Sequence, residues 1–231
     1  MSITLFRKKT AAFFEQHQWI TFIELSVAVF ISISIEFGWI NQYLIFAVFL
    51  YAWLSLWIRG KGWSNFGIKK PESWKNTLLL AVMGGIVFQA LSLYLIEPIL
   101  GKLTGDIPDV SIFRPLVGNV QQLIVWLVIS WTFAAFLEEM IYRGYFMHRF
   151  ADLFKRSNTG WVFGLILANV LFGFGHMYQG TSGMIATGIS GLVFAGLFFT
   201  SKKNLWAAII AHGIYDTVGF LMIFFGVYPG I

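Results

Sequence analysis

The chain of 231 residues contains no cysteine and very few charged side chains. Without cysteine it has no disulfide, no thiol nucleophile and no zinc–thiolate site. Charged residues make up only 12% of the sequence, whereas 58% of the residues are apolar and the mean hydropathy is +0.73. These values leave too little polar surface for a soluble globular domain. The sequence therefore predicts an integral membrane protein whose chemistry uses oxygen or nitrogen side chains.

Long apolar runs are spread over the whole chain. A helix needs about 20 mostly apolar residues to cross the hydrocarbon core of a bilayer. Such runs lie at residues 19–40, 42–58, 76–100, 117–149, 160–178, 183–200 and 204–227. They predict an all-α, polytopic membrane helix bundle with about seven transmembrane helices, with eight as the alternative. The ten-residue alternation of a transmembrane β-barrel is absent.

The sequence predicts one membrane domain over residues 1–231, because no Ser/Pro-rich linker or low-complexity block divides it. The fourth run is too long for a single perpendicular span. We expect its end, from Arg143 to Arg156, to leave the bilayer as an amphipathic extension. His17 and His148 are expected at the membrane surface without a role.

Lysine and arginine are distributed unevenly between the loops. Basic residues accumulate in cytoplasmic loops, and all but two of the 16 lie before the first run, between runs 2 and 3, around the junction of runs 4 and 5, or between runs 6 and 7. Only Lys102 and Arg114 lie on the other side. We therefore expect a cell-membrane protein with a cytoplasmic N-terminus and an external C-terminus. The net charge of +5 is explained by this topology and by contact with anionic membrane lipids, so nucleic acid is not expected as a partner.

Two adjacent glutamates interrupt the fourth run. Charged groups at membrane depth are costly, so they usually face the interior of a bundle and serve a site. Glu139 and Arg143 are four residues apart and lie on one helix face, whereas Glu138 is rotated by about 100° from Glu139. Arg143 is therefore predicted to pair with Glu139, which leaves Glu138 directed towards another span. The structural alternative is that both glutamates only tie helices together.

Three further polar residues lie in the later runs. His176 ends the sequence Phe-Gly-Phe-Gly-His, whose glycines permit close helix approach; a single histidine on an apolar helix is otherwise often a packing residue. His212 and Asp216 are four residues apart, which suits either a hydrogen-bonded pair or two ligands of one metal ion. Measured along the expected helices at about 1.5 Å per residue, these residues and Glu138 fall in one layer of the membrane.

Together these residues form three motifs in order. They read Glu138-Glu139-Met-Ile-Tyr-Arg143, then Phe172-Gly-Phe-Gly-His176, then His212-Gly-Ile-Tyr-Asp216. In this the chain resembles the CAAX protease and bacteriocin-processing (CPBP, or Abi) family of intramembrane endopeptidases, with the motifs Glu-Glu-x-x-x-Arg, Phe-x-x-x-His and His-x-x-x-Asn/Asp. The resemblance covers residues 117–227, and the first three runs carry no matching motif.

The resemblance implies hydrolysis of peptide bonds inside the membrane. Glu138 and His176 would activate a water molecule, and His212 with Asp216 would face the oxyanion of the tetrahedral intermediate. No cofactor is expected. The substrate would be a membrane-associated peptide or protein, either lipid-anchored or membrane-spanning.

The resemblance also has implications for three other motif positions, Glu139, Arg143 and Asp216. Glu139 and Arg143 would hold their helix in register. Asp216 departs from the asparagine of many family members, and an ionised carboxylate would repel an oxyanion. Asp216 would then either be protonated or orient His212 as a hydrogen-bond donor.

Other functions remain open on the sequence alone. His176, His212 and one or more of Glu138, Glu139 and Asp216 form a possible zinc-ligand set for a metalloprotease. A transporter also buries ionisable residues in one layer, but we find no similarity between the halves of the chain. A third alternative is a non-catalytic membrane scaffold or immunity protein.

The remaining acidic residues of the runs are interpreted as boundary residues. Glu24 and Glu36 lie near the two ends of the first run, and Glu97 precedes Pro98 at an expected helix end. We expect them to reach the interface or to cap a helix.

Overall fold

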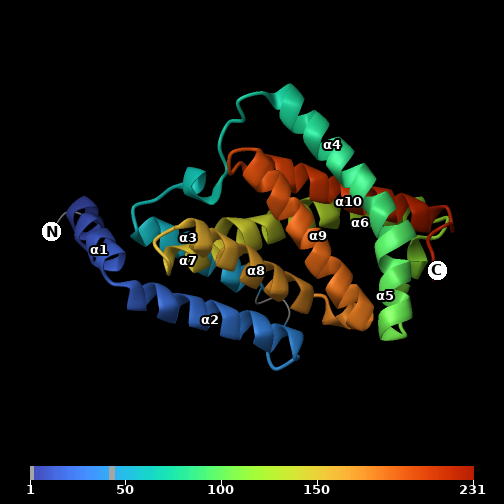
Figure 1. The fold of residues 1–231 in the computed structure, drawn as a ribbon, viewed down its shortest axis with the longest axis horizontal. Coiled ribbons are helices and arrows are strands. Elements are labelled where there is room, and N and C mark those ends of the chain that lie inside the picture. Colours follow the sequence, from blue (N-terminus) through green and yellow to red (C-terminus); the bar gives the residue numbers. More distant parts are fainter. Residues whose placement is uncertain (1–2, 42–44) are drawn as a thin grey trace.

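The computed structural model describes residues 3–41 and 45–231, and every regular element in these ranges is a helix (Figure 1). The α-helices are α1 (Ile3–Gln16), α2 (Gln18–Glu36), α3 (Ile45–Ile58), α4 (Trp74–Leu91), α5 (Glu97–Thr104), α6 (Val120–Ile129), α7 (Met147–Asp152), α8 (Asn158–Phe174), α9 (Gly180–Thr200) and α10 (Leu205–Phe224). Three π-helices join some of them: η3 (Ser92–Ile96), η5 (Ser130–Glu138) and η6 (Met140–Phe146). The predicted all-α fold class is confirmed.

The helices account for the seven apolar runs. Five continuous helices are long and apolar enough to cross a membrane: Gln18–Glu36, Trp74–Thr104, Val120–Asp152, Met177–Thr200 and Leu205–Phe224. The second and fifth runs correspond to the shorter apolar helices α3 and α8. The expected start of the second run, residue 42, lies outside the described residues. The predicted polytopic helix bundle is therefore confirmed.

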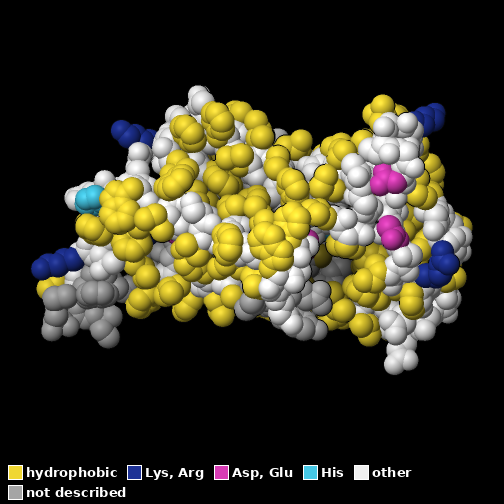
Figure 2. Space-filling view, turned by 90° about the horizontal axis from the view of Figure 1, so that it is seen from below, with side chains coloured by type: hydrophobic (Ala, Val, Ile, Leu, Met, Phe, Trp, Pro, Cys, Tyr) yellow, Lys and Arg dark blue, Asp and Glu magenta, His cyan; other side chains and the backbone are white. Residues whose placement is uncertain are grey.

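The outside of the bundle is hydrophobic. Phe22, Phe30 and Leu79 expose more than half of their surface, as do many other large apolar side chains. In Figure 2, hydrophobic side chains cover the middle of the visible face, and most of the charged side chains in view lie towards the two ends of the molecule. Such a surface would be unstable in water but fits a hydrocarbon environment. The protein is thus membrane-embedded.

The end of the fourth run differs from the expectation of an amphipathic extension. The helix continues through η6 and α7, and residues 140–149 are all buried within the bundle. His148 is buried as well, because its ring packs against Trp161 of α8 and Phe198 of α9. Its Nδ1 donates to the carbonyl oxygen of Arg143 at 2.9 Å. The expected surface positions of this segment and of His148 are therefore wrong.

Small residues allow the helices that carry the site to approach closely. A Cβ atom at Gly85 of α4 would lie 2.6 Å from the carbonyl oxygen of Ala211 on α10. A Cβ atom at Gly173 of α8 would lie 2.7 Å from the carbonyl oxygen of Met184 on α9. Both distances are below van der Waals contact, so larger residues would force the helices apart.

The start of α9 is held by Asp106, which follows α5. Its carboxylate accepts hydrogen bonds from the backbone N–H groups of Thr181 and Ser182, at 2.9 and 3.3 Å, and from the hydroxyl of Thr104. N–H groups in the first turn of a helix have no partner within that helix. The Thr104 hydroxyl, followed by these two amides, holds the pKa of Asp106 below its ordinary value.

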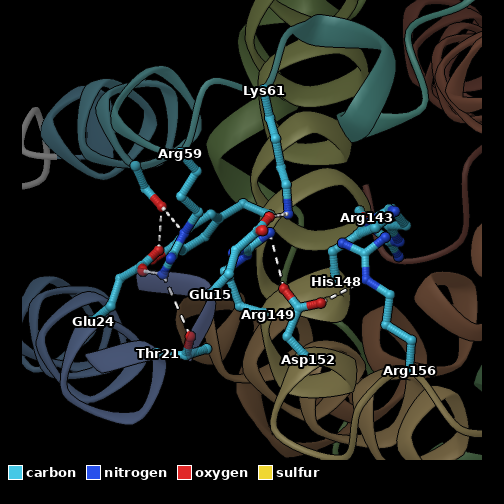
Figure 3. A network of polar contacts seen from close by, with 12 residues as sticks. Glu15, Thr21, Glu24, Arg59, Lys61, Arg143, His148, Arg149, Asp152 and Arg156 are labelled. Carbon is cyan, nitrogen blue, oxygen red and sulfur yellow. Dashed lines mark hydrogen bonds and ion pairs between the residues drawn. The ribbon is translucent and has the colours of Figure 1, made fainter. Parts of the chain in front are cut away.

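A buried ion-pair network ties the helices together at the end of the bundle that carries α1 (Figure 3). Glu24 of α2 pairs with Arg59, which directly follows α3, and both side chains are less than 10% exposed. The carboxylate of Glu24 also accepts hydrogen bonds from Ser55 at 2.5 Å and from Tyr145 of η6 at 2.9 Å. The interpretation of Glu24 as a boundary residue is therefore wrong, because it connects three separate segments.

A first prediction concerns this pair. Glu24→Leu should lower the free energy of unfolding by about 3–5 kcal/mol, because it leaves Arg59 buried without a counter-charge. The double variant Glu24→Leu/Arg59→Met should recover most of this loss. Thermal unfolding of the purified protein in detergent measures both effects. Glu72→Leu is the matched control, since Glu72 pairs with Lys202 on the surface and should change little. Equal effects at Glu24 and Glu72 would contradict the prediction.

Candidate active site

The three motifs meet at one cavity of about 290 Å³ inside the bundle. Glu138 reaches it from the end of η5, His176 from the turn after α8, and His212 and Asp216 from α10. The structure therefore brings together four of the six predicted site residues, from three segments that are distant in sequence. Glu139 and Arg143 do not line the cavity but lie behind it.

Glu138 faces the cavity without a bonding partner. Its Oε2 atom is inaccessible and has no hydrogen-bond partner among the described residues. Arg143 instead bonds to Glu139, with 2.8 Å between its Nη1 and Glu139 Oε1. The predicted difference between the two glutamates is thus confirmed: Glu139 is neutralised by Arg143, and Glu138 points elsewhere. Glu138 is the last residue of η5, and Glu139 lies between η5 and η6; such π turns are frequent at functional sites.

Glu139 is the centre of a fully buried cluster. Its side chain is 0% exposed, and Oε1 accepts hydrogen bonds from both Arg143 and Nδ1 of His212, the latter at 3.0 Å. Arg143 also donates to Oδ1 of Asn169 at 3.1 Å, and its guanidinium lies over the ring of Phe172 at 4.3 Å. Each of these contacts compensates a charge that would be costly in a low-dielectric interior. Arg143 and Glu139 thereby join the fourth span to α8 and α10.

His176 lies beyond the end of its helix and not within a span as predicted. The expected run covered residues 160–178, but α8 ends at Phe174. The last carbonyl groups of a helix have no partner within it, and Nδ1 of His176 donates to one of them, that of Phe172, at 2.9 Å. Because a carbonyl oxygen only accepts, the proton of the neutral ring is on Nδ1. Its Nε2 is then a hydrogen-bond acceptor.

The ring of His212 lies against Glu139, Phe194 and Asp216. Nδ1 is bonded to Glu139, and the ring of Phe194 stacks on it with 4.6 Å between centroids. Nε2 lies 3.7 Å from Oδ2 of Asp216, which is too long for a hydrogen bond, so the expected hydrogen-bonded pair of His212 and Asp216 is not formed. Asp216 instead accepts a 2.6 Å hydrogen bond from the hydroxyl of Ser130.

The side chains around the cavity do not form a metal centre. Among residues 3–41 and 45–231, no three histidine, aspartate or glutamate side chains are arranged to hold a metal ion. The hydrogen bonds at Nδ1 of His176 and of His212 leave Nε2 of each ring free, an arrangement that metal-ligating histidines also have. A zinc site needs at least three protein ligands converging on one point. Among the described residues, the zinc-ligand set considered from the sequence is not assembled in that way.

Some contacts of the site carried no sequence signal. Ser130 is an ordinary polar residue of an apolar helix, and its role follows only from its contact with Asp216. Asn169 is expected on the same helix face as His176, two turns before it, but its bond to Arg143 is seen only in the structure. Glu97 lines the same cavity, although its position before a proline suggested a helix boundary. Their partners come from other spans, so periodicity within one helix does not reveal them.

A second prediction uses two glycines of α9. A Cβ atom at Gly191 would lie 2.3 Å from Asn169 Oδ1 and 2.6 Å from Arg143 Nη2, whereas a Cβ atom at Gly196 would meet nothing within 4 Å. Gly191→Ala should therefore displace Arg143, lower the melting temperature and reduce activity. Gly196→Ala should be neutral or stabilise the helix by about 0.5–1 kcal/mol. Thermal unfolding of both variants tests this, and an unchanged melting temperature for Gly191→Ala would contradict it.

Comparison with known proteins gives one match. Residues 120–218 match the family model of the type II CAAX prenyl endopeptidase Rce1-like proteins. No curated protein and no solved structure matches the chain. The matched segment contains all three motifs, and the family supports an intramembrane endopeptidase in general. The match agrees with the family indicated by the motifs: residues 120–218 are similar to the Rce1-like type II CAAX prenyl endopeptidases, which match the CPBP family.

Proposed function

We propose that the protein hydrolyses peptide bonds of membrane-associated substrates by a glutamate mechanism without a metal ion. The observation that carries this proposal is the carboxyl group of Glu138, which lines the same cavity as His176 and has an oxygen atom that no described residue binds. A buried polar atom without a partner is costly, so its retention favours a role in binding a reacting group.

Glu138 acts as the general base in this proposal. Its carboxylate takes a proton from a water molecule while the water oxygen forms a bond to the carbonyl carbon of the substrate. The electrons of the carbonyl double bond move to its oxygen and create an oxyanion. When the carbon–nitrogen bond then breaks, Glu138 returns the proton to the leaving amine. His176 orients the water, because its Nε2 accepts a hydrogen bond while Nδ1 is held by Phe172.

In this proposal His212 stabilises the oxyanion. Its Nδ1 is fixed by Glu139, and the opposite edge of the ring faces the cavity. A protonated Nε2 there would donate a hydrogen bond to the developing negative charge, an interaction that is strong when bulk water is excluded. Asp216, held by Ser130, stabilises the protonated ring from 3.7 Å. A carboxylate at position 216 would repel the oxyanion if it faced it directly. In this proposal Asp216 instead acts through His212.

The orientation follows from the charge distribution of the loops. We propose a single membrane domain in the cell membrane, with the N-terminus cytoplasmic and the C-terminus external. The lining of the cavity includes Pro108 and Val110 after α5, Gln179 before α9, and Tyr228 near the C-terminus. In this orientation all four lie at the external end of the bundle. Substrate segments would therefore reach the cavity from that side.

A third prediction tests the proposed base. Glu138→Gln should lower kcat for cleavage of a membrane-proximal peptide by about 10²–10⁴-fold, because an amide cannot take the proton from water. His176→Ala should also be strongly impaired. Both variants should keep the melting temperature of the wild type within a few degrees. Glu36→Gln is the control, since Glu36 does not line the cavity. Cleavage at the wild-type rate by Glu138→Gln would refute the mechanism. Absence of cleavage by the wild type with any peptide would favour a scaffold or transporter instead.

A fourth prediction separates the glutamate mechanism from a zinc mechanism. Cleavage should continue at an unchanged rate after incubation with a strong zinc chelator, because no step depends on a metal ion. A zinc peptidase would lose its activity and regain it when zinc is added. The measurement is the initial rate before chelation, after chelation and after zinc addition. Loss with zinc-dependent recovery would show that the ligand arrangement changes when metal binds.

A further inference from the structure

Besides Glu138, His176, His212 and Asp216, the cavity is lined by four polar side chains from α4, α5, α10 and the C-terminal segment. They are Gln89, Glu97, Tyr215 and Tyr228. Glu97 is the first residue of α5 and only 8% exposed. Its position in the cavity shows that the interpretation as a boundary residue was wrong.

The immediate neighbours of Glu97 are neutral. Ser92 donates a hydrogen bond to its Oε1 at 3.0 Å, and the hydroxyl of Tyr228 also interacts with the carboxyl group. Tyr215 in turn donates to Ser92 at 3.3 Å. No lysine, arginine or histidine among the described residues forms an ion pair with Glu97. In this it differs from the buried Glu24 and Glu139, each of which is bound by an arginine.

The cavity as a whole is acidic. Glu97, Glu138 and Asp216 all line it, whereas its lining contains no lysine and no arginine. His212 is already shared between Glu139 and Asp216. Several carboxyl groups in a low-dielectric space, without cationic side chains, attract a positive charge much more strongly than they would in water.

Aromatic rings form part of the cavity wall. Phe113, Trp126 and Phe220 line the cavity and contact one another, with ring centroids 4.8–6.2 Å apart. Aromatic faces attract cations, tryptophan most strongly, and they also accommodate the apolar stem of a lysine or arginine side chain. A carboxyl group beside an aromatic wall is thus suited to a long side chain with a cationic tip.

We propose that Glu97 is a specificity-determining residue that binds a cationic side chain, lysine or arginine, of the peptide substrate. This inference rests on the proposed function, because it assumes that the substrate occupies the same cavity as the reacting water. The bound cation would give Glu97 the counter-charge that the protein itself does not supply. Glu97 takes no part in bond breaking.

The experiment compares matched peptides. A membrane-proximal peptide is prepared with lysine, arginine, glutamine or glutamate at each position around the scissile bond in turn, and kcat/KM is measured with the purified full-length protein in detergent. A hydrogen-bonded charge pair in a buried site is worth about ten- to a hundredfold. At one position, lysine and arginine should therefore exceed glutamine by at least about tenfold, and glutamate should be the poorest.

Glu97→Gln is the decisive variant, since it keeps the shape of the side chain and a hydrogen-bond acceptor for Ser92. It should reduce the ratio between the lysine and glutamine peptides to about one. Tyr228→Phe removes a hydroxyl beside Glu97 but keeps the carboxyl group, so the preference should persist. Glu36→Gln should also keep it. If Glu97 only connected α5 with the C-terminal segment, Glu97→Gln would lower the melting temperature without changing the ratio, and that result would overturn the proposal.

A binding measurement keeps this inference separate from the proposed mechanism. The affinity of the same peptides is measured with Glu138→Gln and with Glu138→Gln/Glu97→Gln. Tighter binding of the lysine peptide that depends on Glu97 supports the inference, even if the wild type cleaves nothing and the hydrolase proposal falls. Equal affinity for the lysine and glutamine peptides, or a preference that survives loss of the carboxyl group, refutes it.

Discussion

The arrangement of the site depends on one buried carboxylate. Glu139 has no access to solvent, and its Oε1 accepts hydrogen bonds from Arg143 on its own helix and from His212 on α10. Arg143 extends the cluster to Asn169 on α8. Removing any of these partners would leave a charge or a polar group buried without compensation, which is far more costly than the loss of one ordinary contact. The three segments are therefore held in one relative position, and the residue next to Glu139 in the chain is fixed with them.

The sequence predicted one of two contacts within a helix, that of Glu139 with Arg143 but not that of His212 with Asp216, and it predicted no specific contact between helices. The pair of Glu139 and Arg143 follows from a four-residue spacing, and the spans follow from composition. The bond between His212 and Glu139 joins residues 73 positions apart, and that between Ser130 and Asp216 joins residues 86 positions apart. Such contacts depend on how the spans pack, which helical periodicity does not encode. The buried position of Glu24 was missed for the same reason, because its partner Arg59 lies in another segment of the chain, directly after α3.

Helix ends and burial were the other sources of error. The expected run extends to residue 178, although the sequence after Gly175 is already mostly polar; in the structure α8 ends at Phe174 and His176 lies in the following turn. A histidine or arginine in an otherwise apolar helix can lie either at the membrane interface or in a polar interior of the bundle. The contacts of His148 with Trp161 and Phe198 decide for the interior. Composition alone cannot distinguish them, since both place polar atoms near a helix end.

The carboxyl groups inside the bundle are of two kinds. This difference separates those that connect helices from those that line the cavity. Glu24 and Glu139 are each bound by an arginine, and both connect helices. Neither Glu97, Glu138 nor Asp216 has a lysine or arginine partner among the described residues, and all three line one cavity. A protein able to place arginines beside two buried carboxylates could have neutralised the others in the same way. Asp216 has His212 at 3.7 Å, whereas Glu97 and Glu138 form no ion pair among the described residues. Because an uncompensated carboxyl group costs stability, the two proposals give these two groups partners from outside the protein: water at Glu138 and a cationic side chain at Glu97.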